Sequence, residues 1–221
     1  MSTSRSVKVS SILGVVSASA LMLAAQVAGA GTIVGSAHDF AGQAWSGGQI
    51  CVACHAPHNT ATTVTEAPLW SHALSTAVYT LYSTSTMQAV ASQPGGVSKL
   101  CLSCHDGTVA VNSFGGVTGT TFLTGGDNLG INLSNDHPIG ITYDAALVTA
   151  DGALNAITTP VTIGTGGTKT KVGTIASNML YAGKLECASC HDVHNTFTSP
   201  GGKLLKVTAT ASAICTTCHS K

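Results

Sequence analysis

Four Cys-x-x-Cys-His segments use all eight cysteines of this 221-residue chain. On a short helical turn, two thiols three positions apart can bond the two vinyl groups on one edge of a haem, and the next histidine reaches the iron. The sequence therefore predicts four covalently bound haem c groups, each with its iron. The attachment residues are Cys51, Cys54, Cys101, Cys104, Cys187, Cys190, Cys215 and Cys218, and the proximal iron ligands are His55, His105, His191 and His219.

Other uses of paired cysteines leave the four histidines unexplained. Disulfides in an exported chain, or a zinc ribbon made from two cysteine pairs, need no histidine directly after each pair. A thioredoxin-like redox motif occurs once, near a βαβ pattern, and not four times. Haem attachment is the interpretation that accounts for every cysteine and for the residue after each pair.

Five histidines remain once the proximal ligands are assigned, whereas four irons need only four distal ligands. His58 and His194 each lie three residues beyond a proximal ligand, on the proximal side of their own haem. Each is therefore expected to ligate a different haem nearby. We expect His38, His58, His137 and His194 to be the distal iron ligands, and His72 to be the spare histidine.

Two protein ligands on every iron leave no open coordination position for a substrate. The methionines Met87 and Met179 are interpreted as packing residues, because the histidines already suffice as ligands. The sequence thus predicts an electron-transfer protein with bis-His irons, not an enzyme. Two alternatives stay open: a soluble periplasmic tetrahaem electron shuttle, and a multihaem reductase in which one haem keeps an open position.

The composition argues against a dense core of side chains. Aromatic residues make up 5% of the chain and charged residues 8%, and there are 25 glycines. The haems then have to supply much of the buried apolar surface. We expect a mostly irregular chain with short α-helices at the haem motifs and little β-structure, a multihaem cytochrome c wrapped around a haem chain. Residues 66–93 hold the best helix pattern, and the segments 161–163 and 169–172 flank a Gly-Thr-Gly-Gly turn that indicates a hairpin.

The N-terminal segment, residues 1–30, is predicted to be a cleaved signal peptide. Arg5 and Lys8 precede an apolar run at 12–25, and Ala-Gly-Ala at 28–30 fits a cleavage site. The mature tetrahaem domain, residues 31–221, is therefore expected outside the cytoplasm. The formal net charge of +0, from 9 basic and 9 acidic residues, provides no basic surface for nucleic acid.

The motifs and the segments between them form an ordered series. They are Cys-Val-Ala-Cys-His-Ala-Pro-His at 51–58, Pro-Leu-Trp at 68–70, Cys-Leu-Ser-Cys-His-Asp-Gly at 101–107, Leu-Ser-Asn-Asp-His-Pro at 133–138, Cys-Ala-Ser-Cys-His-Asp-Val-His at 187–194 and Ile-Cys-Thr-Thr-Cys-His at 214–219. This series resembles the tetrahaem extracellular filament cytochromes of metal-reducing bacteria, of the OmcE type. The resemblance runs from His38 to the C-terminus and is weakest in the Gly/Thr-rich middle.

The resemblance implies that copies of the chain polymerise head to tail into an extracellular conductive filament, a nanowire of stacked haems. It also implies that one distal histidine is donated between subunits, either His58 or otherwise His38. Electrons would come from upstream periplasmic or outer-membrane cytochromes and pass to external acceptors. A heterologous contact that does not close generates such an open filament. His72 departs from the pattern of this group.

Overall fold

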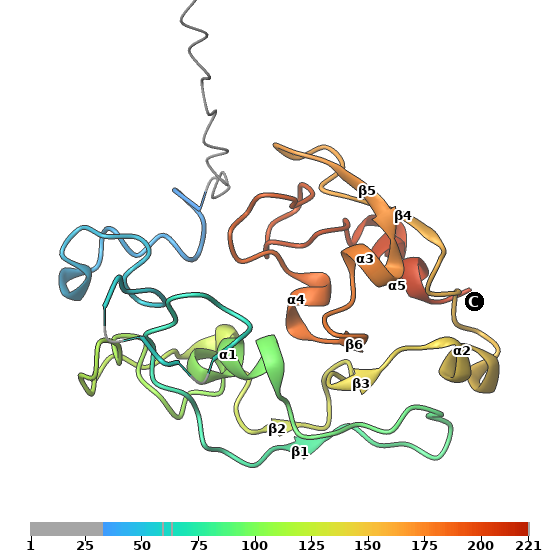
Figure 1. The fold of residues 1–221 in the computed structure, drawn as a ribbon, viewed down its shortest axis with the longest axis horizontal. Helices are drawn as coiled ribbons and strands as arrows, with labels where there is room; N and C mark the ends of the chain where they lie inside the picture. The colour runs from blue at the N-terminus through green and yellow to red at the C-terminus, as the bar shows by residue number, and fades with distance from the viewer. Residues whose placement is uncertain (1–32, 59, 63, 221) are drawn as a thin grey trace, which may run out of the picture.

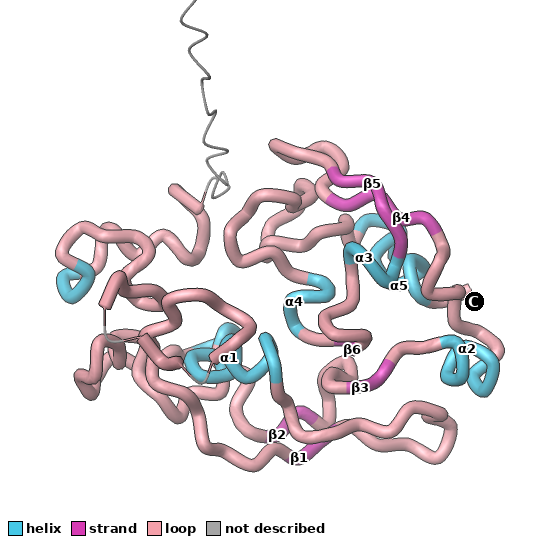
Figure 2. The backbone as a smooth tube through the Cα atoms, viewed as in Figure 1, coloured by secondary structure: helices cyan, strands magenta, loops and turns pink. Residues whose placement is uncertain are grey.

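The regular elements of the chain are short, and long loops join them (Figure 2). A computed structural model describes residues 33–58, 60–62 and 64–220. The predicted signal peptide at 1–30 lies outside these described residues. The prediction of a mostly irregular chain with few short helices and small sheets is confirmed. No helix in the part of the chain that the structure describes combines the length and apolar character needed to cross a bilayer.

Three of the α-helices carry a Cys-x-x-Cys pair each, as the sequence predicts for the haem motifs. The first motif forms only a single turn, in which the backbone N–H of His55 donates to the carbonyl oxygen of Cys51 at 2.9 Å. The described helices are α1 (Gly96–His105), α2 (Ala145–Asp151), α3 (Ile175–Asn178), α4 (Cys187–Cys190) and α5 (Ala213–Cys218), with 3-10 turns at Ala44–Ser46, Gly125–Asp127 and Thr210–Ser212.

The strands form sheets of two strands each within the described residues. The pair β4 and β5 is the antiparallel hairpin that the glycine-rich turn predicts, although β5 begins two residues later than expected. The other two pairs join distant segments, one parallel and one antiparallel. The strands are β1 (Thr80–Leu81), β2 (Asn132–Leu133), β3 (Ile141–Thr142), β4 (Pro160–Ile163), β5 (Lys171–Thr174) and β6 (Lys184–Leu185).

The helix expected within residues 66–93 does not form; this part of the chain holds only the short strand β1. Its backbone groups bond to distant segments instead of to one another. The N–H of Ala73 donates to Ser113, and the N–H of Thr80 donates to Ile131. These tertiary hydrogen bonds override the local helix pattern, and the helix begins only after Pro94, at Gly96.

Within the described residues, two small apolar clusters take the place of one continuous core. The larger cluster lies between α2, α3 and the β4–β5 hairpin and includes Ile175, which is fully buried, and Met179, which is 1% exposed. The smaller cluster packs Tyr79, Leu102 and Leu133. The clusters meet the motifs only at single residues, namely Leu102 in the smaller cluster and Cys218 at the edge of the larger one. The side chains alone therefore do not supply a core at the motifs, which agrees with the aromatic-poor composition.

Candidate functional site

The first three Cys-x-x-Cys-His motifs neighbour one another in space in their sequence order. The first motif lies beside the second, because Cys54 is near enough to Cys104 to act on its thiol. Burial and the nearby Cys54 together raise the pKa of Cys104 to about 12. A side-chain hydrogen bond joins Cys101 in α1 to Cys187 in α4. The backbone N–H of Cys187 also donates to the hydroxyl of Ser98 at 2.9 Å. The second and third motifs are therefore in direct contact.

The fourth motif continues this succession. Cys190 in α4 lies near Cys218 in α5. Burial and this nearby thiol raise the pKa of Cys218 to about 11. Figure 1 shows α1, α4 and α5 following one another across the molecule in the same order. All eight cysteines have free thiols. The site thus offers four neighbouring thiol pairs, which is the donor set that haem c requires.

Three of the four proximal histidines donate or share a ring hydrogen with a backbone carbonyl. Each of these bonds uses Nδ1, which leaves Nε2 as the nitrogen that faces away from the backbone. This is the arrangement by which proteins fix the tautomer and orientation of a metal-binding imidazole. The bonds join His55 to Pro68 at 2.8 Å, His105 to Asp127 at 2.8 Å, and His191 to Lys203 at 2.7 Å.

The structure brings three proximal histidines opposite three of the expected distal ones. Two imidazoles on one iron, with bonds of about 2 Å and each ring centre about 1 Å behind its nitrogen, have centres roughly 6 Å apart. The observed separations match that value. The ring centres are 6.1 Å apart for His38 and His105, 6.2 Å for His55 and His194, and 6.3 Å for His137 and His219.

His58 and His191 are the expected ligands that the structure does not pair. Both are exposed, and within the described residues neither has another imidazole at the spacing of the three pairs. His191 is one of the proximal histidines that hydrogen-bonds a backbone carbonyl. One proximal and one distal candidate are therefore left over within a single chain.

His72, the expected spare histidine, is 2% exposed and is not a member of these pairs. Its Nδ1 is 2.7 Å from the carbonyl oxygen of Ala73, and its Nε2 is 3.1 Å from that of Ala110. Nε2 is also 3.4 Å from the sulfur of Cys104. Both ring nitrogens face protein atoms, so this side chain fixes two loops beside the second motif.

Three buried nitrogens near the first two motifs have no hydrogen-bond partner in the described chain. They belong to His38, Trp45 and Trp70. Trp70 is 7% exposed and packs edge-on to His55, with ring centres 6.1 Å apart. Buried N–H groups normally donate hydrogen bonds. Acceptors from outside the chain, such as haem carboxylates, would therefore satisfy these nitrogens. Burial and the nearby His105 lower the pKa of His38 to about 4, which keeps it in the neutral form that binds metals.

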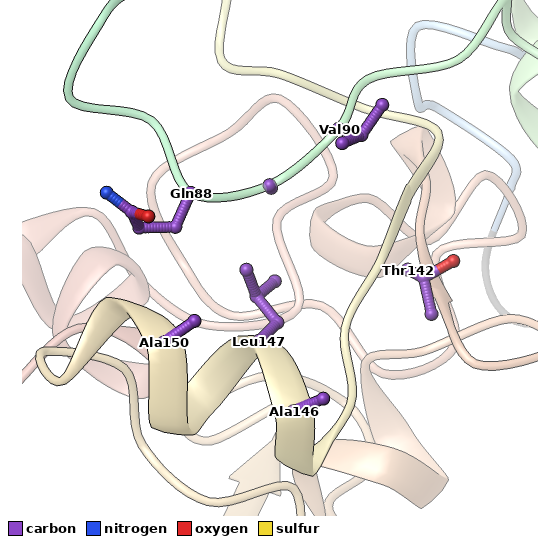
Figure 3. A pocket seen from close by; sticks show the side chains of 7 residues that line it. Gln88, Val90, Thr142, Ala146, Leu147 and Ala150 are labelled. Carbon is purple, nitrogen blue, oxygen red and sulfur yellow. The ribbon is translucent and has the colours of Figure 1, made fainter.

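Two cavities lie apart from the paired histidines or at their margin. One, of about 340 Å³, lies between residues 88–90 and α2, where Leu147 and Ala150 face the loop (Figure 3). No titratable side chain lines it, so it offers no acid–base chemistry. The other, of about 360 Å³, is bordered by His194, Asp192 and the buried Lys206. It continues the polar margin of the histidine pair that contains His194.

Sequence reasoning missed the groups that orient the site. The carbonyl oxygens of Pro68, Asp127 and Lys203 carry no sequence signal, because every residue has one. Asp106 and Asp192 did carry a signal, since each follows the histidine of its motif directly. The Asp106 carboxylate is buried and accepts hydrogen bonds from Ser75, Tyr79 and Thr108.

Comparison with known proteins identifies one similarity. Residues 180–221, which hold the third and fourth motifs, match the family described as the doubled CXXCH motif. The doubled motif indicates covalently bound haem c with iron in a multihaem electron-transfer cytochrome. No match to the chain was found among curated proteins.

Proposed function

We propose that this multihaem c-type cytochrome carries four bis-His haems and polymerises into an extracellular filament that conducts electrons. The observation that carries the proposal is the set of three imidazole pairs at 6.1 to 6.3 Å. Each pair combines a proximal histidine of one motif with a histidine from elsewhere in the chain. Each of these three pairs would hold one iron between two imidazole nitrogens.

The pairs support a distal ligand for three of the four proximal histidines. His194 would serve the iron at His55, His38 the iron at His105, and His137 the iron at His219. In each pair the distal residue comes from a segment outside the motif of its iron. The haem would supply reversible one-electron chemistry when it is bound. The chain would orient the imidazoles, keep neighbouring haems close together and exclude substrates.

The two leftover ligands point to a contact between copies. His58 of one subunit would complete the iron at His191 of the next, since both side chains are exposed in a single chain. If each subunit donates His58 to one neighbour and accepts His58 from another, the contact is heterologous and propagates into an open filament. Such a filament would continue the succession of motifs from one subunit to the next. Its electrons would enter from periplasmic or outer-membrane cytochromes and leave to external acceptors.

The test compares the secreted wild-type chain with His58→Ala and His194→Ala, all produced with haem maturation. Electron microscopy should show filaments for the wild type and for His194→Ala, but monodisperse particles for His58→Ala. Both variants should keep four haems by mass spectrometry, and each should gain one iron that binds carbon monoxide. His194→Ala is the matched control, because it removes the equivalent residue of the other His-x-x-His segment inside one chain.

Two other results would replace the proposal. Monodisperse wild-type particles with four low-spin irons would favour a soluble periplasmic electron shuttle. A wild-type iron that is high-spin and binds carbon monoxide or nitrite would favour a reductase with one open haem. If filaments persist in His58→Ala, the ligand shared between subunits is another residue, and His38 is the next candidate.

A further inference from the structure

Asp106 is a buried carboxylate placed directly after the proximal histidine of the second motif. It is 4% exposed. One oxygen accepts from the hydroxyls of Ser75 at 2.5 Å and Tyr79 at 2.6 Å. The other accepts from the backbone N–H of Thr108 at 2.7 Å and from its hydroxyl at 2.8 Å. Four neutral donors therefore surround the carboxylate and favour its ionised form.

No cation compensates this charge within the described residues, since no lysine or arginine contacts the Asp106 carboxylate. A buried, unpaired charge is unfavourable unless a compensating charge lies near it. The carboxylate belongs to the residue that directly follows His105, at the C-terminal end of α1 and two residues from Cys104, so its electrostatic field reaches the second motif. Cys104 is an attachment residue, so the same field acts on the haem held there.

The residues that directly follow the other proximal histidines provide no equivalent charge, and Glu186, a buried carboxylate that precedes the third motif, has the cation Lys184 nearby. Ala56 and Ser220 follow the proximal histidines of the first and fourth motifs. Asp192 follows that of the third, but its carboxylate accepts from backbone N–H groups of its own loop, including that of Phe197 at 2.7 Å. Lys206 lies near Asp192 and lines the same cavity. Among the residues that directly follow the proximal histidines, Asp106 is therefore the buried carboxylate with no cation beside it.

We infer that Asp106 is a fixed negative charge that lowers the reduction potential of the haem attached at Cys101 and Cys104. The inference rests on the proposed function, because it takes that haem to be bound and bis-His. A reduced cytochrome donates one electron, which converts ferric to ferrous iron; no bond forms or breaks and Asp106 stays ionised. The carboxylate stabilises the more positive ferric state, so it makes reduction to the ferrous state less favourable. The chain would then have a low-potential step at its second haem.

Asp106→Asn tests the inference in the full, haem-loaded protein. The amide has the shape of the carboxylate, and the hydroxyls of Ser75 and Tyr79 can turn to accept from it. In a spectroelectrochemical titration, the reduction equilibrium constant of one haem should increase by about tenfold or more. This corresponds to a rise in its reduction potential of about 59 mV for one electron. The remaining transitions should move less.

Tyr79→Phe is the control, because it weakens the same hydrogen-bond network and keeps the charge. Its titration should match the wild type within about threefold, even where its stability falls. An Asp106→Asn protein with full haem content, low-spin irons and unchanged transitions would overturn the inference, as would an equal shift in Tyr79→Phe. A missing haem at the second motif, or a high-spin iron there, would instead count against the proposed function.

Discussion

The imidazole rings of His55 and His194 lie 6.2 Å apart, centre to centre, with 24° between their planes. His55 belongs to the first motif, whereas His194 lies just beyond the third. Each ring is therefore held by a different motif, and an iron between them would tie the two motifs together. The other two pairs are more strongly crossed, at 60° for His38 with His105 and 68° for His137 with His219.

These angles predict two classes of ferric signal in electron paramagnetic resonance. Nearly parallel imidazoles interact with the same iron d orbital and separate it in energy from its partner, which gives a rhombic low-spin spectrum. Crossed imidazoles act on both orbitals about equally, which gives a highly anisotropic spectrum with a larger maximum g value. For the three irons that are paired within one chain, we expect a rhombic signal from the His55–His194 iron and highly anisotropic signals from the other two. The His194→Ala variant should lose the rhombic signal alone.

A spectrum in which His194→Ala removes a highly anisotropic signal would contradict these pairings. The His137→Ala variant is the matching control, because it should remove one highly anisotropic signal and leave the rhombic one intact. Loss of the same signal in both variants would mean that the two histidines serve one iron.

Met179 offers a test of the interpretation that no methionine binds iron. Its side chain is 1% exposed and packs in the cluster that contains Ile175 and Val161. Met179→Leu conserves the volume and should change the free energy of unfolding by less than about 1.5 kcal/mol. The absorption spectrum of the oxidised protein should be unchanged. A variant that loses a low-spin iron would show that Met179 is an axial ligand after all.

The local parts of this molecule could be predicted from sequence, and the tertiary parts could not. The Gly-Thr-Gly-Gly turn specifies the β4–β5 hairpin, because the turn residues and flanking strands are contiguous. The expected helix within 66–93 failed because that segment bonds to Ser113 and Ile131, which no local pattern reveals. The first motif forms a turn and not a helix for a similar reason: Ser71 donates to the carbonyl of Cys54.

The candidate site divides in the same way. Attachment cysteines and proximal histidines follow from spacing within five residues, so sequence alone indicates them. The partner of each proximal histidine comes from another segment, as with His38 and His105, and depends on how the loops fold back. The Asp106 network joins residues from two distant places in the chain, so only the structure shows that its charge is buried.

Lys206 makes the stability of the protein depend on pH. Its ammonium donates to the carbonyl of Asn178 at 3.1 Å and to the hydroxyl of Tyr181 at 2.9 Å, and the residue is 5% exposed. Burial lowers the pKa of Lys206 from 10.5 to about 8. Between these values the unfolded chain binds more protons than the folded one, so stability rises with pH across this window.

The comparison with Lys206→Met isolates this contribution. Relative to the variant, the free energy of unfolding of the wild type should increase by up to roughly 3 kcal/mol between pH 8 and pH 10.5. Denaturant unfolding followed by circular dichroism at several pH values measures both curves. A difference between the two proteins that stays constant across the window would show that the lysine does not titrate there.

His72 provides the sharpest separation of a structural histidine from an iron ligand. Its nitrogens lie 2.7 Å and 3.1 Å from the carbonyl oxygens of Ala73 and Ala110, so it lacks a nitrogen directed at an iron. His72→Phe removes these contacts while it keeps an aromatic ring in the buried site. The protein should retain four haems and its low-spin irons, and lose about 1–3 kcal/mol of stability because buried carbonyls lose a donor. His72→Asn should recover part of that loss, since its amide can donate to one carbonyl. If His72→Phe instead produces an iron that binds carbon monoxide, His72 is a ligand, and one of the other four histidines is the spare.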